Sequence, residues 1–217
     1  MSLYIIYFSM SYKIVVARYQ ENIDWLDPVK KDCIFINKGK ALGLENEILL
    51  PNVGRESDSY LWYIIQNYHQ LPDIVVFTQG DISDHRYMFK PNYYKCLLKT
   101  IEQTKSDGKS RPYHTHNMND PTINPQWNYS ESDNTYFLPD NYKNNIPVKF
   151  GEWFVKHVHP VYPDPIHVYW NAIFAVKKEY ILKRPREYYE KLIQEVNHHV
   201  NSTEGHFFER SWYYIFE

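Results

Sequence analysis

Three short apolar runs most constrain how this chain can fold. They are "YKIVVARY" (12–19), "DCIFINKG" (32–39) and "DIVVFTQG" (73–80). Each is rich in β-branched residues, and continuous apolar runs of this length are typical of strands buried on both faces of a parallel sheet. The pattern therefore predicts three central strands.

Helical patterns lie between and after these runs. The clearest follows "LPNVGRES", with Asn52 as the expected N-cap, Pro72 as its end, and one apolar face made of Tyr60, Leu61, Ile64, Ile65 and Tyr68. Further helices are expected within 86–100, after Pro185, and over 207–216. Strands that alternate with helices predict an α/β fold with a mostly parallel central sheet flanked by helices, related to Rossmann folds.

The size of the chain suits one domain. Its 217 residues are enough for one sizeable core and too few for two. From about 101 to 150 the periodicity fades and Asn, Pro, Ser, Thr and Asp dominate, which indicates a long functional or mobile loop region.

Charge and cysteine content narrow the class of protein. A net charge of −2 gives no reason to expect nucleic acid or an anionic membrane as partner. Two cysteines make no disulfide framework, which favours a reducing compartment. The opening "MSLYIIYFSM" lacks a basic start and a cleavage site, Met10 is an alternative start, and no apolar segment is long enough to span a membrane. We expect a soluble cytoplasmic protein.

Ligands of parallel α/β sheets bind beyond the carboxyl ends of the strands. That rule selects the segments after the three runs, namely "ARYQEN", "NKGKA" and "TQGDISDH". We expect the three to converge on one edge of the sheet.

The last of these segments contains candidate metal ligands. Asp81, Asp84 and His85 offer carboxylate oxygens and an imidazole, and Mg²⁺ or Mn²⁺ takes carboxylates together with phosphate oxygens. The spacing D-x-x-D-H is also common by chance, so an ordinary solvated turn is the alternative.

Two further groups are candidates for anion binding. Arg18 could clamp a phosphate while Glu21 holds a ribose or base edge, and the alternative is a surface ion pair. Asn52 and Arg55 are expected at a helix start, where free N–H groups favour anions, although the sequence favours a simple helix cap over an anion site.

The end of the chain holds a candidate base. In "GHFFERSW", Glu209 could be a general base in an aromatic setting, or a carboxylate that faces the dipole at a helix start. The pairs His114/His116 and His157/His159 could bind zinc, but each lacks a third ligand nearby. No P-loop, G-x-G-x-x-G or G-x-S-x-G motif occurs, so nucleotide triphosphatases and α/β-hydrolases are not supported.

Five blocks along residues 13–216 carry a resemblance. They are "VVARYQENIDWL", "LPNVGRESDSYLWYIIQNY", "LPDIVVFTQGDISDH", "NAIFAVKKEYILKRPREYY" and "GHFFERSWYYIF". Together they resemble an uncharacterised domain family of fungi and large DNA viruses, which is distantly similar to glycosyltransferases of the GT-A fold.

The resemblance implies a transferase that uses a nucleotide-sugar donor and a glycan or protein acceptor. Residues 12–100 would form the nucleotide-binding half, with Arg18, Glu21, Asn52, Arg55 and Gln79 near the nucleotide, and 101–217 the acceptor side. Gln79 stands where GT-A enzymes place the first acid of their D-x-D, which leaves Asp81 with Asp84 and His85 as helpers for a manganese or magnesium ion. His206 would complete the metal shell, and Glu209 would be the catalytic base.

Three functions remain open from sequence. The leading hypothesis is glycosyl transfer, with the diphosphate steadied by a metal at Asp81 or by Arg18 and Arg55. The second is a non-catalytic module that binds a glycan or nucleotide. The third and weaker one is a metal-dependent hydrolase built on Asp81, Asp84, His85 and the later histidines.

Overall fold

The computed structural model describes residues 10–82, 93–110, 123–127 and 148–217. Its centre is a six-stranded sheet in the order β3-β2-β1-β4-β6-β5. The parallel strands are β1 (Tyr12–Arg18), β2 (Cys33–Asn37), β3 (Glu47–Leu49) and β4 (Ile74–Gln79), and the antiparallel edge consists of β6 (Phe174–Lys177) and β5 (Lys109–Ser110). The predicted α/β fold with a mostly parallel sheet is confirmed.

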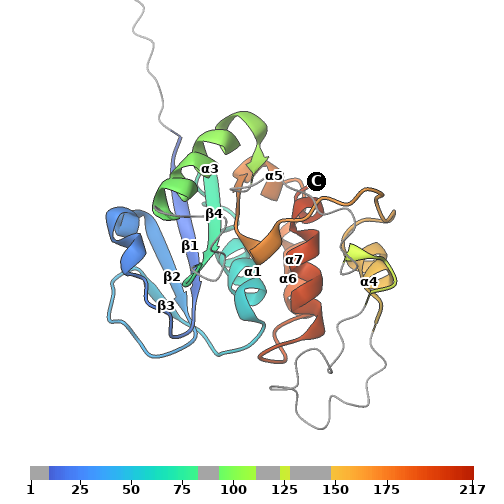
Figure 1. Ribbon diagram of the computed structural model, residues 1–217, viewed down its shortest axis with the longest axis horizontal. Coiled ribbons are helices and arrows are strands. Elements are labelled where there is room, and N and C mark those ends of the chain that lie inside the picture. Colours follow the sequence, from blue (N-terminus) through green and yellow to red (C-terminus); the bar gives the residue numbers. More distant parts are fainter. Residues whose placement is uncertain (1–9, 83–92, 111–122, 128–147) are drawn as a thin grey trace, which may run out of the picture.

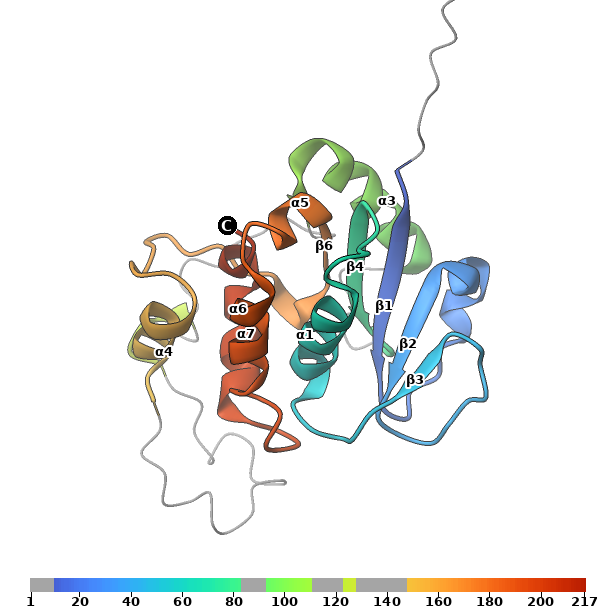
Figure 2. The same ribbon diagram turned by 180° about the vertical axis from the view of Figure 1, so that it is seen from behind.

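Helices cover both faces of the sheet (Figures 1 and 2). The 3-10 helix η1 (Asp24–Asp32) and α3 (Tyr93–Asp107) lie on one face. The other face packs against α1 (Arg55–Asn67), α6 (Arg186–Ile193) and α7 (Thr203–Ile215), with α4 (Phe150–His157) beyond α7. Two short helices flank β6, namely η6 (Trp170–Ala172) and α5 (Lys178–Ile181).

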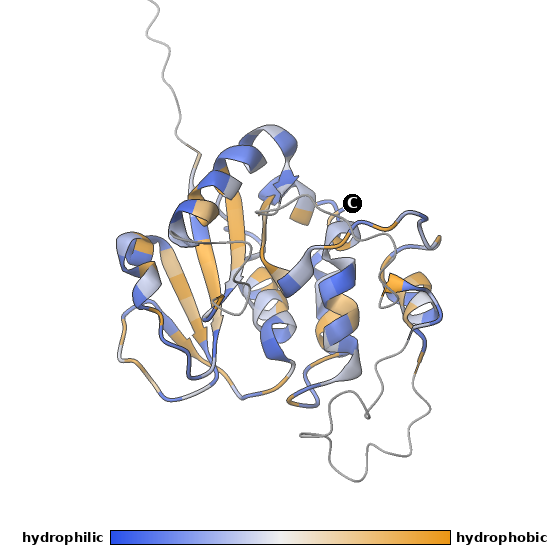
Figure 3. Ribbon diagram, viewed as in Figure 1, coloured by the Kyte–Doolittle hydropathy of each residue, from blue (hydrophilic) through white to orange (hydrophobic). Residues whose placement is uncertain are grey.

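The two-sided burial explains why the strands read as continuous apolar runs. In β1, Ile14 and Val16 pack toward η1 and α3, whereas Val15 packs toward α1, and all three are fully buried. Figure 3 shows the central strands as the most hydrophobic part of the fold. A polar residue at any of these positions would face a core.

Much of the aromatic content serves the core between α1, α7 and the sheet. The Tyr60 ring lies 4.8 Å from Phe77 and 5.8 Å from Trp212, and Trp212 lies 5.4 Å from Phe174, centroid to centroid. Offset and tilted contacts of this kind add to the stability from area burial. The aromatic side chains therefore fasten the last helix to the centre of the sheet.

Several predicted boundaries are wrong. Helix α3 continues to Asp107, so regular structure reaches past the expected boundary at residue 100. The N-cap of α1 is Gly54, in the left-handed region at φ 62°, instead of Asn52. Gly54 can adopt this conformation without a Cβ clash, and its N–H is bonded to the His199 carbonyl at 2.7 Å.

The last helix begins earlier than the expected residue 207. Ser202 is its N-cap, and the Ser202 Oγ accepts a hydrogen bond from the Gly205 N–H at 3.2 Å. Glu209 consequently lies well inside α7, and the interpretation of Glu209 as a carboxylate at a helix start is wrong.

Among the residues that the structure describes, no helix combines the length and the apolar character needed to cross a membrane.

Candidate functional site

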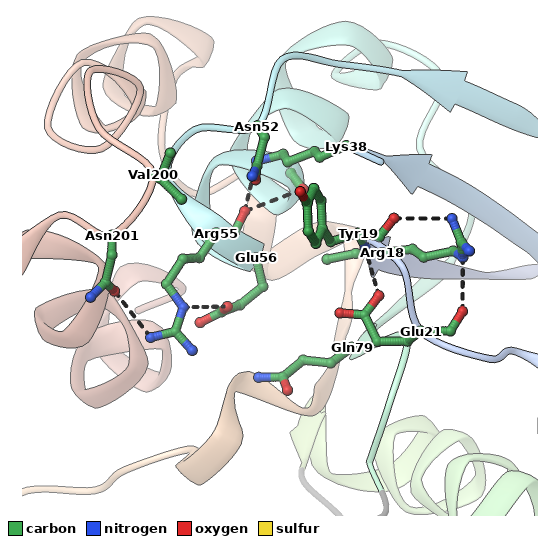
Figure 4. A pocket seen from close by; sticks show the side chains of 12 residues that line it. Arg18, Tyr19, Glu21, Lys38, Asn52, Arg55, Glu56, Gln79, Val200 and Asn201 are labelled. Atoms are coloured by element: carbon green, nitrogen blue, oxygen red, sulfur yellow. Dashed lines mark hydrogen bonds and ion pairs between the residues drawn. The ribbon is translucent and has the colours of Figure 1, made fainter. Parts of the chain in front are cut away.

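A pocket of about 560 Å³ opens at the carboxyl ends of β1, β2 and β4 (Figure 4). The chain leaves β1 toward β2 on one side and returns to β4 on the other, so this is the point where the strand order reverses. Open α/β sheets bind ligands at such a point because the connecting segments diverge there and leave a crevice.

The three segments selected from sequence do converge here. The first contributes Arg18, Tyr19 and Glu21, the second Lys38, and the third Gln79. The start of α1 and the loop before α7 complete the wall with side chains from Asn52, Arg55, Glu56, Ser59, Val200 and Asn201. Glu56, Val200 and Asn201 were missed from sequence, because no local pattern shows that residues near 200 meet the start of α1.

Two glycines let the segments approach one another. A Cβ at Gly39 would lie 1.7 Å from the Tyr19 carbonyl oxygen, and one at Gly80 would lie 3.1 Å from Glu21 Oε2. The indole of Trp25 donates to the Gly80 carbonyl at 2.8 Å, which fixes the turn after β4. The loops can therefore lie this close together only because positions 39 and 80 are glycines, which have no side chain.

Arg18 is a buried cation in the pocket wall. Its guanidinium donates to the carbonyl oxygens of Tyr19 and Glu21 at 3.1 and 3.0 Å, and also to Asn37 Oδ1 and the Lys40 carbonyl. All of these acceptors are neutral, and within the described ranges no carboxylate forms an ion pair with it, although Arg18 is only 9% exposed. A buried charge without a counter-ion is unfavourable, and an anionic ligand would compensate it.

Lys38, by contrast, has a buried counter-ion. Its Nζ lies 2.7 Å from Asp58 Oδ2, and it also donates to the carbonyl oxygens of Arg55, at 2.7 Å, and Val53. Burial lowers the pKa of Lys38, and Asp58 opposes that shift. Lys38 thus ties the end of β2 to the start of α1.

Arg55 presents a more exposed cation to the same pocket. Its backbone lies in the left-handed region at φ 49°, directly after Gly54. The guanidinium is 3.6 Å from Glu56 Oε2 and 3.3 Å from Asn201 Oδ1. Figure 4 shows the Arg55 side chain pointing toward both residues. The side chain remains 44% exposed, so the cation is accessible to a ligand.

Glu209 lies behind this wall and does not belong to the pocket lining. Its Oε1 accepts from the Asn171 N–H at 2.6 Å, and its Oε2 lies 3.3 Å from Arg210 Nη1. Burial raises the pKa of Glu209, whereas Arg210 lowers it and Glu56 raises it further. A carboxylate whose pKa is raised is a stronger base than an ordinary one.

Of the predicted metal ligands, the structure describes Asp81 and His206. Asp81 is exposed after Gly80 and does not line the pocket, and Asp84 and His85 lie outside the described residues. His206 is on α7 near Arg55 and Arg210. In the described part of the chain no group of three or more His, Cys, Asp and Glu side chains could hold a metal, so the manganese or magnesium site stays a prediction.

The position of His206 makes stability depend on pH. Burial and the cations Arg55 and Arg210 lower the pKa of His206 from 6.5 to about 3. Folded His206 stays neutral where the unfolded chain is protonated, so its contribution is complete above pH 6.5 and is lost as the pH falls toward 3. We expect His206→Gln to reduce the loss of unfolding free energy between pH 7 and pH 4.5 by about 2 kcal/mol.

Urea denaturation at the two pH values measures this difference. His69→Gln is the matched control because His69 is exposed in the turn that follows the far end of α1, and it should leave the pH dependence of the wild type unchanged. An identical pH dependence in His206→Gln and the wild type would contradict the prediction.

Comparison with known proteins gives one match. The model of a family described as "Protein of unknown function (DUF3431)" matches residues 14–217. No curated protein and no solved structure matches the chain. Since the family model covers nearly all of the sequence, including every residue of the pocket, the chain belongs to the DUF3431 family.

Proposed function

We propose that this protein is a glycosyltransferase-like enzyme that binds a nucleotide-sugar donor in the pocket at the carboxyl edge of the sheet. The observation that carries the proposal is the buried Arg18 guanidinium, which lines the pocket and contacts only neutral oxygens among the described residues. A diphosphate is a ligand that supplies the missing negative charge.

The rest of the lining fits the other parts of such a donor. The accessible cation of Arg55 can reach a second phosphate oxygen, and the exposed ring of Tyr19, at 44%, offers a flat apolar face for a base or sugar. Asn52, Gln79 and Asn201 add amide groups that hydrogen-bond hydroxyls. Arg18 and Arg55 together supply the positive charge that a departing diphosphate requires.

The proposed reaction uses Glu209 as the base. An acceptor hydroxyl would give its proton to the Glu209 carboxylate while its oxygen bonds to the anomeric carbon of the sugar. The bond from that carbon to the diphosphate breaks, and the diphosphate leaves with the bonding electrons. The raised pKa of Glu209 supports this role, since it makes the carboxylate a stronger base.

A calorimetric titration with uridine, guanosine and adenosine diphosphates, with and without Mn²⁺, tests the donor site. We expect one of them to bind, and Arg55→Ala to weaken that binding by about 10- to 100-fold because a charged hydrogen bond is lost. The control is Arg186→Ala, since Arg186 is similarly exposed at 40% and pairs with Glu190 far from the pocket. Asp81→Ala tests the metal: Mn²⁺-dependent binding lost in this variant would place the ion there.

The second candidate function is that of a non-catalytic binding module with the same fold. It is favoured by the position of Glu209, which lies behind the pocket lining with both carboxylate oxygens engaged. Such a module would bind the nucleotide or a glycan but would not release nucleoside diphosphate from any nucleotide sugar. Absence of binding to every nucleoside diphosphate would contradict the transferase and a nucleotide-binding module, and would leave only a module that binds a glycan.

A further inference from the structure

Gln79 connects the pocket to the short helix η6, which contains Asn171. It is the last residue of β4 and lines the pocket, and its Nε2 donates to the backbone carbonyl of Asn171 at 2.9 Å. A carbonyl can only accept, so this contact fixes which end of the amide faces Asn171. The remaining oxygen, Oε1, accepts no hydrogen bond from a residue in the described ranges and is available to a ligand hydroxyl.

The backbone that Gln79 holds is strained. Asn171 has φ 65° and the following Ala172 has φ 52°, and both are non-glycine residues in the left-handed region. Each such residue costs about 1–2 kcal/mol. A strained turn persists only where its surroundings hold it in place, and Ala172 is fully buried.

The strained turn aims one N–H group at Glu209. The Asn171 N–H donates to Glu209 Oε1 at 2.6 Å. The other oxygen, Oε2, accepts from Arg210, whose guanidinium carbon Cζ lies 4.3 Å from the ring centroid of Trp127 and 5.0 Å from that of Trp170. One carboxylate oxygen is thus positioned by the turn and the other by an immobilised cation.

The titratable groups in the cluster around Glu209 come from two helices. Arg210 and His206 lie on α7 itself, and Arg55 and Glu56 face it from the start of α1. None of these contacts involves Gln79. A change at Gln79 therefore alters the Asn171 contact without removing any charge from the cluster.

We infer that Gln79 is a positioning residue, which holds the Asn171–Ala172 turn so that the Asn171 N–H fixes Glu209 and links this carboxylate to the contents of the pocket. Glutamine suits this position because its amide donates to the Asn171 carbonyl while its oxygen can accept from a ligand. An acid at this position would be unable to donate once ionised. The role of Glu209 as base rests on the proposed function, whereas its positioning by Gln79 does not.

The test follows the titration of Glu209 by NMR in protein carrying ¹³C-labelled glutamate carboxyl groups, with the signal assigned by Glu209→Gln. In Gln79→Ala the turn relaxes and the carboxylate loses a hydrogen bond that favours its charged form, so we expect the pKa of Glu209 to rise by about one unit. Gln79→Met keeps about the same side-chain length without a charge, cannot donate to the Asn171 carbonyl, and should raise the pKa as well. Gln66→Ala, at an exposed site on α1, should leave it unchanged.

The comparison is made first without ligand. A wild-type pKa of Glu209 in both Gln79 variants would overturn the inference, and Gln79→Met alone decides it if Gln79→Ala does not fold. Uridine diphosphate is then added: in the wild type its binding should shift the Glu209 signal, and in Gln79→Ala binding should occur without that shift. If uridine diphosphate does not bind the wild type, its part in the proposed function fails, while the ligand-free comparison still decides the role of Gln79.

Discussion

Asp58→Ala is expected to destabilise the protein by about 3–5 kcal/mol, because it leaves the buried Lys38 ammonium without its counter-ion. The side chains of Lys38 and Asp58 are 4% and 6% exposed and lie 2.7 Å apart. The two remaining acceptors of Lys38 are neutral backbone carbonyls. Urea denaturation at pH 7 measures the loss of unfolding free energy.

A double-mutant cycle separates the pair from its surroundings. We expect Lys38→Met to cost a comparable amount, since it leaves Asp58 buried and unpaired, and the combination Lys38→Met/Asp58→Ala to cost clearly less than the sum of the two. The control is the surface pair Lys30–Asp27, where Asp27→Ala should change stability by less than about 1 kcal/mol. Additive effects of the two core substitutions would show that Lys38 and Asp58 do not stabilise one another.

Gly39→Ala is expected to cost about 3 kcal/mol or more, because the new methyl group would overlap with backbone and not with a movable side chain. It would lie 1.7 Å from the Tyr19 carbonyl oxygen, to which Arg18 donates a hydrogen bond. The loops after β1 and β2 would have to separate, so the pocket and the position of Arg18 would change with the stability.

The matched control is Gly43→Ala. Gly43 has φ 72° but nothing lies within 4 Å of an added Cβ, so only the conformational penalty of about 1–2 kcal/mol is expected. Thermal and urea denaturation measure both variants, and calorimetry measures nucleotide binding. An effect of Gly39→Ala no larger than that of Gly43→Ala would contradict the close approach of the two loops.

The strands of the central sheet could be predicted because their burial on both faces produces a recognisable pattern in consecutive residues. A strand covered by helices on both faces has no position at which a polar side chain is favourable, so β1, β2 and β4 appear as uninterrupted apolar runs. The convergence of Arg18, Lys38 and Gln79 on one edge followed from the parallel order alone. The short strands β3 and β5 have three and two residues, which is too few to form a recognisable apolar run.

Helix boundaries were harder to predict from the sequence, because contacts between residues distant in the chain determine them. Asn52 has the side chain of an N-cap, but α1 begins at Arg55, after a left-handed Gly54 whose N–H is bonded to the His199 carbonyl. At the other end of the chain, Gly205 is a poor helix former, so the local sequence does not indicate that α7 begins at Thr203. The helix start there is stabilised by the Ser202 cap.

The sequence by itself therefore determined the α/β class, the central strands and the edge of the sheet at which the pocket opens. Only the tertiary structure decided which side chains meet there. Arg55 contacts Asn201 across 146 positions of the chain, and Glu209 is held by a strained turn at Asn171 that Gln79 supports. The physical reason is that a buried apolar face requires apolar residues at neighbouring positions of the chain, so the sequence shows it locally. A buried charge or a strained turn requires stabilising partners, and packing can bring these from anywhere in the chain.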